Sequence, residues 1–215
     1  MIYPPIAAII FDLDNCLLDP RELGDGLVEP LIAAIRRANH ATLSERDLQA
    51  ALDDLWWRPF DKVADEWHFS ESMRMAGWRA CAALRIEGRL HGYDDLMVLN
   101  ELPMTTFLVT SGFQHLQHSK IRALGIGKRF AEIHIDAIDD PGHPGKQAIF
   151  QQIICRWQFP AQQVMVVGDS GESEIAAGNR LSMCTVQLLR PAVEPVSNAD
   201  HHVADLWQLK ALLGL

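Results

Sequence analysis

Residues 9–19 read IIFDLDNCLLD and place two carboxylates, Asp12 and Asp14, directly after an apolar run. The run IAAIIF at 6–11 is short and uncharged, which is typical of a strand buried on both faces. A single Asp after a strand commonly caps a helix or forms a turn. The meaning of the acid pair therefore depends on the residues at the ends of the other strands of the chain.

Further apolar runs of strand length occur after residue 100, and they are TFLVT (106–110), EIHID (132–136), VMVVG (164–168) and CTVQL (184–188). Helical patterns lie between them at 113–125, 146–157 and 172–181, and the first ends at a Gly that can cap a helix. Strand and helix in alternation predict an α/β fold whose core is a doubly wound (Rossmann-like) parallel sheet. The amphipathic segment 202–215 predicts a closing helix whose Leu and Trp side chains pack in the core.

The interval between the first two strands differs from the rest of the chain. It contains no convincing strand, and amphipathic helical patterns occur at 27–38, 44–57 and 70–85. Ser44, followed by an acid three residues later, is a predicted N-cap. We predict an all-helical cap at residues 19–99, inserted into a core formed by residues 1–18 and 100–215. The alternative is a set of extra helices packed on one sheet face.

The charge and composition of the chain argue against several classes of partner. The 215 residues carry a formal net charge of −9, which disfavours a broad electrostatic contact with nucleic acid or anionic lipid. No apolar stretch approaches the ~20 residues that a membrane-spanning helix needs. The four cysteines lie far apart without a C-x-x-C pair, which predicts reduced thiols in a cytoplasmic protein. We expect no nucleic-acid partner and no membrane partner.

Polar side chains follow the ends of four predicted strands. In a doubly wound sheet, ligands bind beyond the carboxyl ends of the strands, near the point where the strand order reverses. Acids that converge there repel one another unless a cation neutralises them, and carboxylate oxygens suit Mg²⁺. A metal with a lysine and a hydroxyl opposite forms a cradle for phosphate. The residues at these ends are Asp12, Asp14, Thr110, Ser111, Lys146, Asp169, Glu172 and Glu174.

On these residues the chain resembles the haloacid dehalogenase-like (HAD) hydrolase superfamily, and within it the small phosphatases with a helical cap inserted after the first strand. The family's first motif, D-x-D-x-T or V, corresponds to DLDNC at 12–16. Its second motif, a Ser or Thr that ends an apolar strand, corresponds to Thr110. Its third, a Lys, falls on Lys146, and its fourth, G-D-x-x-x-x-D, corresponds to GDSGESE at 168–174.

The resemblance implies different roles for the two acids of the first motif. Asp12 would attack phosphorus and form an aspartyl phosphate, which divides hydrolysis into two easier steps. Asp14 would protonate the leaving oxygen and then activate water. The dehalogenase branch carries an aromatic residue in place of the second acid, so Asp14 favours phosphoryl transfer over carbon–halogen cleavage.

The same resemblance implies a metal site and a phosphate site. The implied Mg²⁺ ligands are Asp12, the backbone carbonyl of Asp14, Asp169 and, where the family has Asp, Glu174. The implied phosphate-binding residues are Thr110, Ser111 and Lys146.

The first motif departs from the common D-x-D-G-T form at two positions. Asn15 stands where the glycine usually is, and Asn tolerates the left-handed backbone better than most other residues. Cys16 replaces the Thr and is a weaker hydrogen-bonding group. We interpret Cys16 as a packing residue, with a catalytic thiol as the alternative.

Two further assignments have competing candidates. Glu174 adds a methylene relative to the usual Asp, so it could reach the metal through water or orient the lysine, and Glu172 is its competitor. Lys146 lacks the Pro that often follows this lysine. Lys120 is the alternative, although its position on an amphipathic helix predicts a solvated side chain.

Substrate contacts are predicted in the cap, where the segment DLWWRPFDK (54–62) offers Trp57 and Arg58 for ring stacking or anion binding. The resemblance thus predicts a Mg²⁺-dependent phosphatase for a small phosphorylated metabolite, as a monomer or homodimer. The alternatives are a phosphomutase on the same site, or a non-catalytic phosphometabolite-binding protein whose site is weakened by Cys16 and Glu174.

Overall fold

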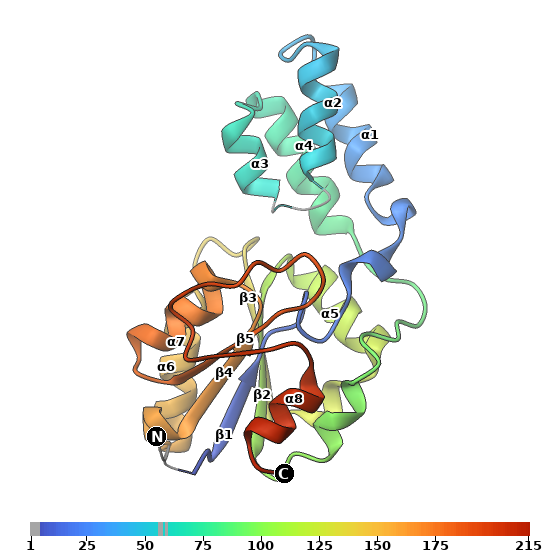
Figure 1. Cartoon of the computed structure of the whole chain (residues 1–215). Helices are drawn as coiled ribbons and strands as arrows, with labels where there is room; N and C mark the ends of the chain where they lie inside the picture. The colour runs from blue at the N-terminus through green and yellow to red at the C-terminus, as the bar shows by residue number, and fades with distance from the viewer. Residues whose placement is uncertain (1–4, 56–57, 59) are drawn as a thin grey trace.

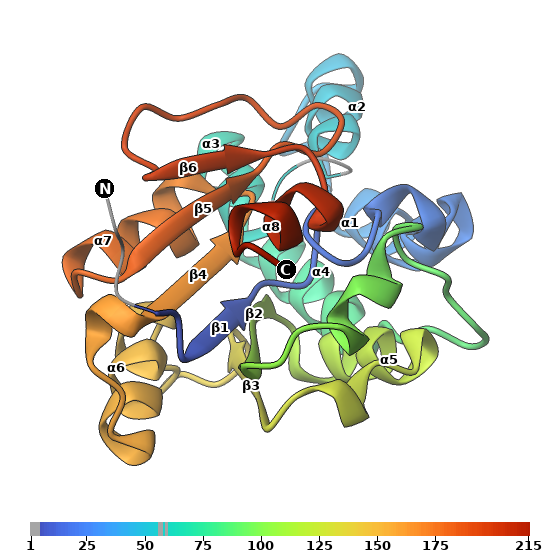
Figure 2. The same cartoon turned by 60° about the horizontal axis from the view of Figure 1, so that its bottom comes forward.

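The computed structural model describes residues 5–55, 58 and 60–215, and in this part of the chain six parallel strands form one sheet (Figures 1 and 2). The strands are β1 (Ala8–Phe11), β2 (Thr105–Gly112), β3 (Glu132–Ala137), β4 (Val164–Gly168), β5 (Cys184–Leu188) and β6 (His201–Val203). Their order across the sheet is β3-β2-β1-β4-β5-β6. The order reverses at β1, between β2 on one side and β4 on the other, so the predicted doubly wound sheet is confirmed.

All five predicted strands form, and β4 and β5 have the predicted bounds. The edge strand β6 was not predicted, because three residues with two histidines give no apolar run. The closing helix is correspondingly shorter than predicted: α8 spans Leu206–Leu212. Leu206 and Leu209 are buried as expected, but the prediction of a core position is wrong for Trp207 and Leu215, which are 44% and 49% exposed.

Helices cover both faces of the sheet. They are α5 (Gln114–Leu124), α6 (Lys146–Trp157), α7 (Ala176–Arg180) and α8. Ala8 and Ile10 of β1 pack with α6 and α7, whereas Ile9 and Phe11 pack with α5 and α8 on the opposite face. This alternation follows from the two-residue period of a strand. Each fully buried Ile or Phe contributes about 1.5–3 kcal/mol, so both faces stabilise the central strand.

Among the residues that the structure describes, four α-helices between β1 and β2 form the cap, which lies over the carboxyl ends of the strands (Figure 1). They are α1 (Glu29–Ala38), α2 (Glu45–Asp54), α3 (Phe60–Glu66) and α4 (Glu71–Ala83). The Oγ of Ser44 accepts a hydrogen bond from the amide of Asp47 at 3.2 Å, so its predicted role as N-cap is confirmed. The seven-residue α3 was not predicted because it is too short to show a helical period. In the described residues, no helix is long and apolar enough to cross a membrane.

The cap has its own apolar cluster, and this cluster reaches the core next to the end of β2. Leu31, Ile35 and Leu52 are among its buried residues. Phe113, which follows β2, belongs to the same cluster, and the ring of Trp78 from α4 packs edge-on against it with 4.9 Å between ring centroids. Aromatic pairs prefer this geometry. The cap is therefore attached to the core beside the predicted catalytic edge.

The segment between α4 and β2 packs with the core rather than with the cap helices. Leu90, Val98 and Leu99 lie in the same apolar cluster as Ile9 and Phe11. The predicted domain boundaries, 19–99 for the cap and 1–18 with 100–215 for the core, stay a prediction, and the packing places the end of the cap helices at Ala83.

A buried ion pair fastens the loop after β1 to the rest of the core. Arg190, just after β5, donates two hydrogen bonds to Asp95, at 2.8 and 2.9 Å, and two more to the backbone carbonyl of Cys16. Its guanidinium carbon also lies 3.8 Å from the ring centroid of Tyr93. Asp95 accepts a further hydrogen bond from the amide of Leu206 at the start of α8. One buried arginine thus joins four segments that are distant in sequence.

We predict that Asp95→Ala lowers the free energy of unfolding by about 3–5 kcal/mol, because it leaves the guanidinium of Arg190 buried without its counter-ion. Asp94 is exposed, so Asp94→Ala is the matched control and should change stability by about 0.5 kcal/mol or less. Urea denaturation of the three proteins measures the difference. Equal stabilities for the two variants would contradict the assignment.

Candidate active site

The loop after β1 positions the first two acids. The amide of Asp12 donates to the carbonyl of Val167 at 2.9 Å and so continues the pairing of β1 with β4. Asn15 adopts φ 54°, the left-handed conformation expected of the residue in the glycine position, and its amide donates to the carbonyl of Leu18. The loop is therefore a tight turn that directs Asp12 and Asp14 beyond the end of the strand.

Cys16 packs behind this turn. Its side chain is fully buried, and its Sγ lies 3.7 Å from the carbonyl oxygen of Val167. Burial, reinforced by the charge of Asp12, raises the pKa of the thiol well above its ordinary value. A thiol that stays protonated and inaccessible is a poor nucleophile, which supports the packing interpretation.

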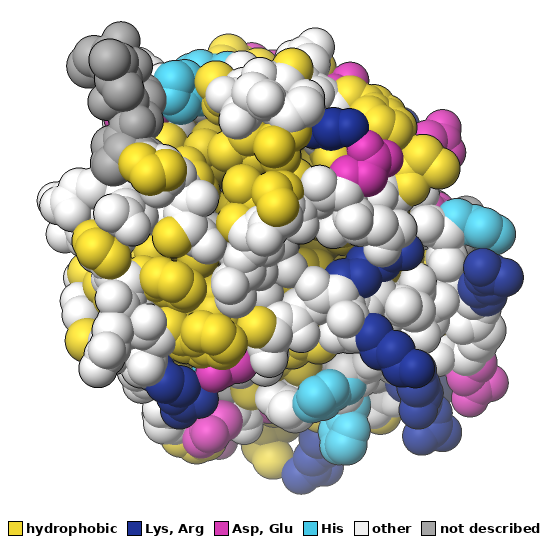
Figure 3. Space-filling model, turned by 90° about the horizontal axis from the view of Figure 1, so that it is seen from below, with side chains coloured by type: hydrophobic (Ala, Val, Ile, Leu, Met, Phe, Trp, Pro, Cys, Tyr) yellow, Lys and Arg dark blue, Asp and Glu magenta, His cyan; other side chains and the backbone are white. Residues whose placement is uncertain are grey.

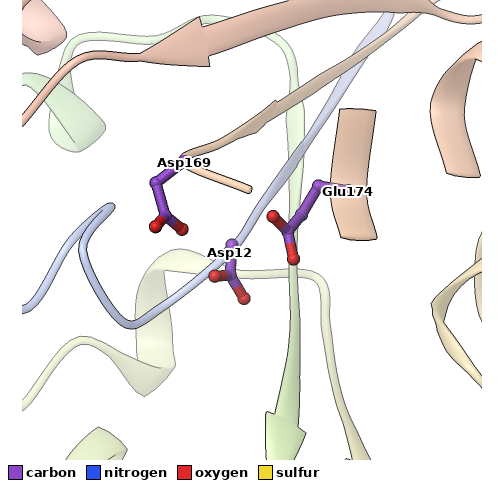
Figure 4. Close-up of side chains that lie close together, drawn as sticks. All are labelled: Asp12, Asp169 and Glu174. Carbon is purple, nitrogen blue, oxygen red and sulfur yellow. The ribbon is translucent and has the colours of Figure 1, made fainter. Parts of the chain in front are cut away.

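Three carboxylates meet at the end of β1 and β4 (Figure 4). Asp12, Asp169 and Glu174 each offer an oxygen, and these oxygens lie within 4.8 Å of one another. Burial raises the pKa of Asp12 well above its ordinary range, and together with the charge of Glu174 it raises the pKa of Asp169 to about 6. Glu172 is exposed, so Glu174 is the acid that joins the cluster.

Glu174 reaches the cluster from a π-helical turn at Gly171–Ile175. Its Oε2 accepts a hydrogen bond from the amide of Ser170 at 3.1 Å. A Cβ at Gly168 would lie 2.7 Å from the Cγ of Glu174, so the longer acid fits because position 168 carries no side chain.

Lys146 provides a positive charge inside this cluster. It is the first residue of α6, is 8% exposed, and donates from Nζ to Asp12 Oδ1 at 2.7 Å and to Glu174 Oε1. Burial alone would lower the pKa of its ammonium group, but the charges of Asp12 and Glu174 outweigh burial and raise it. One ammonium beside three carboxylates leaves a deficit of positive charge that a divalent cation would fill, and hard oxygen donors suit such a cation.

Asp14 is turned away from the cluster and paired with α5. The Nζ of Lys120 lies 2.8 and 2.9 Å from its two carboxylate oxygens, and the Nε2 of Gln117 donates to Oδ2 at 2.9 Å. The predicted contribution of the Asp14 backbone carbonyl to a metal stays a prediction.

The prediction that Lys120 is solvated is wrong, because its side chain is buried against Asp14. Sequence reasoning also missed Gln117. The signal was present in the helical period: positions 117 and 120 share the face of α5 that buries Ile121. Polar residues at positions that the apolar pattern assigns to the interior have to find polar partners.

Thr110 and Ser111 lie at the end of β2 but point to opposite faces, as adjacent strand residues do. Thr110 is buried, and its Oγ1 accepts a hydrogen bond from Gln117 at 2.6 Å. The hydroxyl of Ser111 donates to Asp136 at 3.0 Å, and Asp136 also accepts from the amide of Gly145, just before Lys146. Through Asp136, Ser111 thus stabilises the loop that precedes Lys146. Phosphate binding by Ser111 stays a prediction.

Of the two predicted cap contacts, the structure describes Arg58. Trp57 lies outside the described residues. Arg58 is exposed and forms ion pairs within the cap, with Glu66 and, at 3.5 Å, with Asp54. A substrate role for either residue stays a prediction.

Comparisons with known proteins show the family to which the chain belongs. Residues 6–181 match the model of a family described as haloacid dehalogenase-like hydrolase, and the chain belongs to this family. The glyceraldehyde 3-phosphate phosphatase of Methanopyrus kandleri is 28% identical over 206 residues, which is 86% of this chain and 84% of the relative. The predicted family and the prediction of a hydrolytic enzyme are thereby confirmed.

Solved structures share the fold over nearly the whole chain. A HAD phosphatase from Thermococcus onnurineus has a TM-score of 0.68 at 19% identity and covers 97% of this chain and 98% of its own. The HAD-hydrolase YfnB from Bacillus subtilis, bound to magnesium, has a TM-score of 0.64 at 17% identity and covers 99% of this chain and 100% of its own.

We predict that Mg²⁺ stabilises the protein through the acidic cluster. At about 100 times its dissociation constant, the ion should add about 2.7 kcal/mol, which corresponds to a rise in Tm of about 5–10 °C for a chain of this size. Thermal unfolding with Mg²⁺ and with EDTA measures the shift.

Asp169→Asn should remove most of this Mg²⁺-dependent shift, because it deletes one charged ligand. Glu172→Gln removes the same charge two residues before Glu174, outside the cluster, and should keep the shift. A shift that is lost equally in both variants would contradict the assignment.

Proposed function

We propose that the protein is a Mg²⁺-dependent phosphatase that hydrolyses a small phosphorylated metabolite through an aspartyl phosphate on Asp12. The observation that carries this proposal is the contact of Lys146 with Asp12, inside a cluster of three carboxylates, two of them buried, at the point where the strand order reverses. The name of the Methanopyrus kandleri relative and the magnesium bound to YfnB support the reaction and the ion.

Asp12, Asp169 and Glu174 are the residues that would hold the metal. A bound Mg²⁺ supplies positive charge, which lessens the repulsion between the attacking carboxylate and the phosphate. The Nζ of Lys146 already contacts Asp12, so it lies where it can also bind an oxygen of the transferring phosphoryl group. Thr110 offers a buried hydroxyl at the neighbouring strand end.

In the first step, a carboxylate oxygen of Asp12 forms a bond to phosphorus while the bond from phosphorus to the ester oxygen breaks. Asp14 gives a proton to that oxygen, and the alcohol leaves. In the second step, Asp14 takes a proton from water, whose oxygen forms a bond to phosphorus while the bond from phosphorus to the Asp12 oxygen breaks, so that inorganic phosphate leaves and the Asp12 carboxylate is restored. Lys120 and Gln117 act on this chemistry through Asp14, whose carboxylate they hold in one orientation.

The phosphomutase alternative uses the same first step and differs in the acceptor of the second, so release of inorganic phosphate separates the two. The non-catalytic alternative rested on Cys16 and Glu174. Cys16 packs against the carbonyl of Val167, which also accepts from the amide of Asp12, and Glu174 contacts the lysine that contacts Asp12. Both departures from the motif are therefore compatible with a working site.

We predict that the protein releases phosphate from p-nitrophenyl phosphate with Mg²⁺ and that EDTA abolishes the turnover. Asp12→Asn should lower kcat by about 10³-fold or more, since it removes the nucleophile, whereas Glu172→Gln should retain kcat. Circular dichroism checks that the variants are folded. Metal-independent turnover, or no turnover with a broad panel of phosphate esters, would overturn the proposal.

We predict that Lys120→Met slows the hydrolysis of esters with poor leaving groups more than the hydrolysis of esters with good ones. An alkyl ester needs the proton from Asp14, whereas p-nitrophenolate leaves without it. The value of kcat/KM, which reports the steps up to phosphoenzyme formation, should fall by about 10²-fold for the alkyl ester and much less for the aryl ester.

Two variants control for the charge and the fold. Lys120→Arg keeps a cation beside Asp14 and should recover part of the alkyl-ester rate, and Lys128→Met alters an exposed lysine and should leave both rates unchanged. An equal loss for both esters in Lys120→Met would rule out positioning of a proton donor.

A further inference from the structure

A hollow lined by arginines lies on the core, away from the acidic cluster. It has a volume of about 830 Å³ and is formed by residues 85–89, the C-terminal end of α5 and the turn beyond it. Seen from below, Lys and Arg side chains gather on the right of the face, the side on which α5 lies in Figure 2 (Figure 3). Four basic residues line the hollow, namely Arg85, Arg89, Arg122 and Arg129, and its one acidic lining residue is Glu87.

This concentration of positive charge is weakly compensated in a chain whose net charge is −9. Arg85 pairs with Glu87 at 3.5 Å, but both side chains are largely exposed, so the pair contributes little. Arg129 donates to the side-chain oxygen of Asn100, which carries no charge. Within the described part of the chain, the side chains of Arg89 and Arg122 form no hydrogen bond and no ion pair.

The backbone around the hollow is fixed, so the arginines are held near one another. The amide of Ile86 donates to Ser119 Oγ at 2.8 Å, and the amide of Leu90 donates to the carbonyl of Ala123 at 3.1 Å. These two bonds hold the segment that carries Arg85 and Arg89 along α5, beside Arg122. Like charges brought together in this way repel one another unless an anion binds between them.

We propose that this hollow binds a small anion that contains a diphosphate group, either free or as part of a nucleotide. A guanidinium group binds phosphate oxygens in pairs, and the four Arg and one Glu of the lining leave a formal charge of +3, which exceeds the charge of about −1.5 to −2 that one phosphate group carries. The volume lies in the range of small-molecule sites. The proposal does not depend on the proposed phosphatase activity.

The site is distinct from the catalytic edge because α5 separates the two. Lys120 is buried against Asp14, whereas Arg122 is exposed two residues later, on the other side of the helix. Two residues correspond to about 200° of rotation around a helix about 10 Å wide. A ligand in the hollow therefore contacts no residue of the acidic cluster.

A bound diphosphate would also tie the return segment from the cap to the core. Arg85 and Arg89 belong to this segment, while Arg122 and Arg129 belong to the core. A second hollow, of about 700 Å³, lies on the cap side of the same segment, where Gly26 and Ala83 contribute to its lining. Ligand contacts on the core side are therefore expected to slow amide exchange at residues 86–90.

Isothermal titration calorimetry of the full chain with pyrophosphate, ADP and orthophosphate tests the proposal. EDTA is present throughout, because the acidic cluster repels phosphate without a metal. We expect pyrophosphate or ADP to bind more tightly than orthophosphate, and Arg89→Ala with Arg122→Ala to raise the Kd by about tenfold or more. Tighter binding of ADP than of pyrophosphate assigns the site to a nucleotide, and the reverse assigns it to the free anion.

The matched control is Arg37→Ala with Arg46→Ala, which removes two exposed arginines of the cap and changes the net charge equally. It should retain the wild-type Kd, and so should Asp12→Asn. Hydrogen exchange should show ligand-dependent protection of residues 86–90 in the wild type and not in the Arg89/Arg122 variant. No binding of either diphosphate, or an equal loss in both double variants, would overturn the proposal.

Discussion

The contact of the Lys146 ammonium with Asp12 and Glu174 is the interaction on which the rest of the site depends. Three carboxylates near one another in a buried position would repel each other and stay protonated without a compensating charge. Lys146 supplies part of that charge from the start of α6, Asp12 follows β1, where the strand order reverses, and Glu174 lies in the turn after the neighbouring strand β4. The same contact therefore joins both halves of the sheet and favours the charged form of the nucleophile candidate.

The two acids of the first motif have different buried lysine partners, and the second of these lysines is Lys120. Asp12 faces Lys146, and Asp14 faces Lys120, although the acids are two residues apart. Each carboxylate thus has its own lysine from a different helix, and the tight turn at Asn15 determines the direction of each. The two proposed roles, attack on phosphorus by Asp12 and proton transfer by Asp14, thus correspond to two different environments at the end of one strand.

The sequence predicted the sheet, the cap and the acidic edge because each has a local signal. Apolar runs mark the strands, and the acids follow their ends in the chain. The helical period places positions 117 and 120 in the interior, but it does not name Asp14 as their partner. The pairing of Arg190 with Asp95 has no local signal, since a buried Arg looks like a solvated one until its distant acid is known. Strand β6 was not predicted for a related reason: it forms by pairing with β5, and its own three residues carry no strand signal.

Glu174 is longer than the Asp that usually ends the fourth motif, and it fits only because position 168 is a glycine. The longer acid occupies the space above Gly168 that a Cβ would take, and it uses that space to reach both Lys146 and the amide of Ser170. Positions 168 and 174 are therefore sterically coupled. A side chain at 168 would collide with Glu174, whereas a shorter acid at 174 is compatible with glycine at 168, so the constraint between the two positions acts in one direction only.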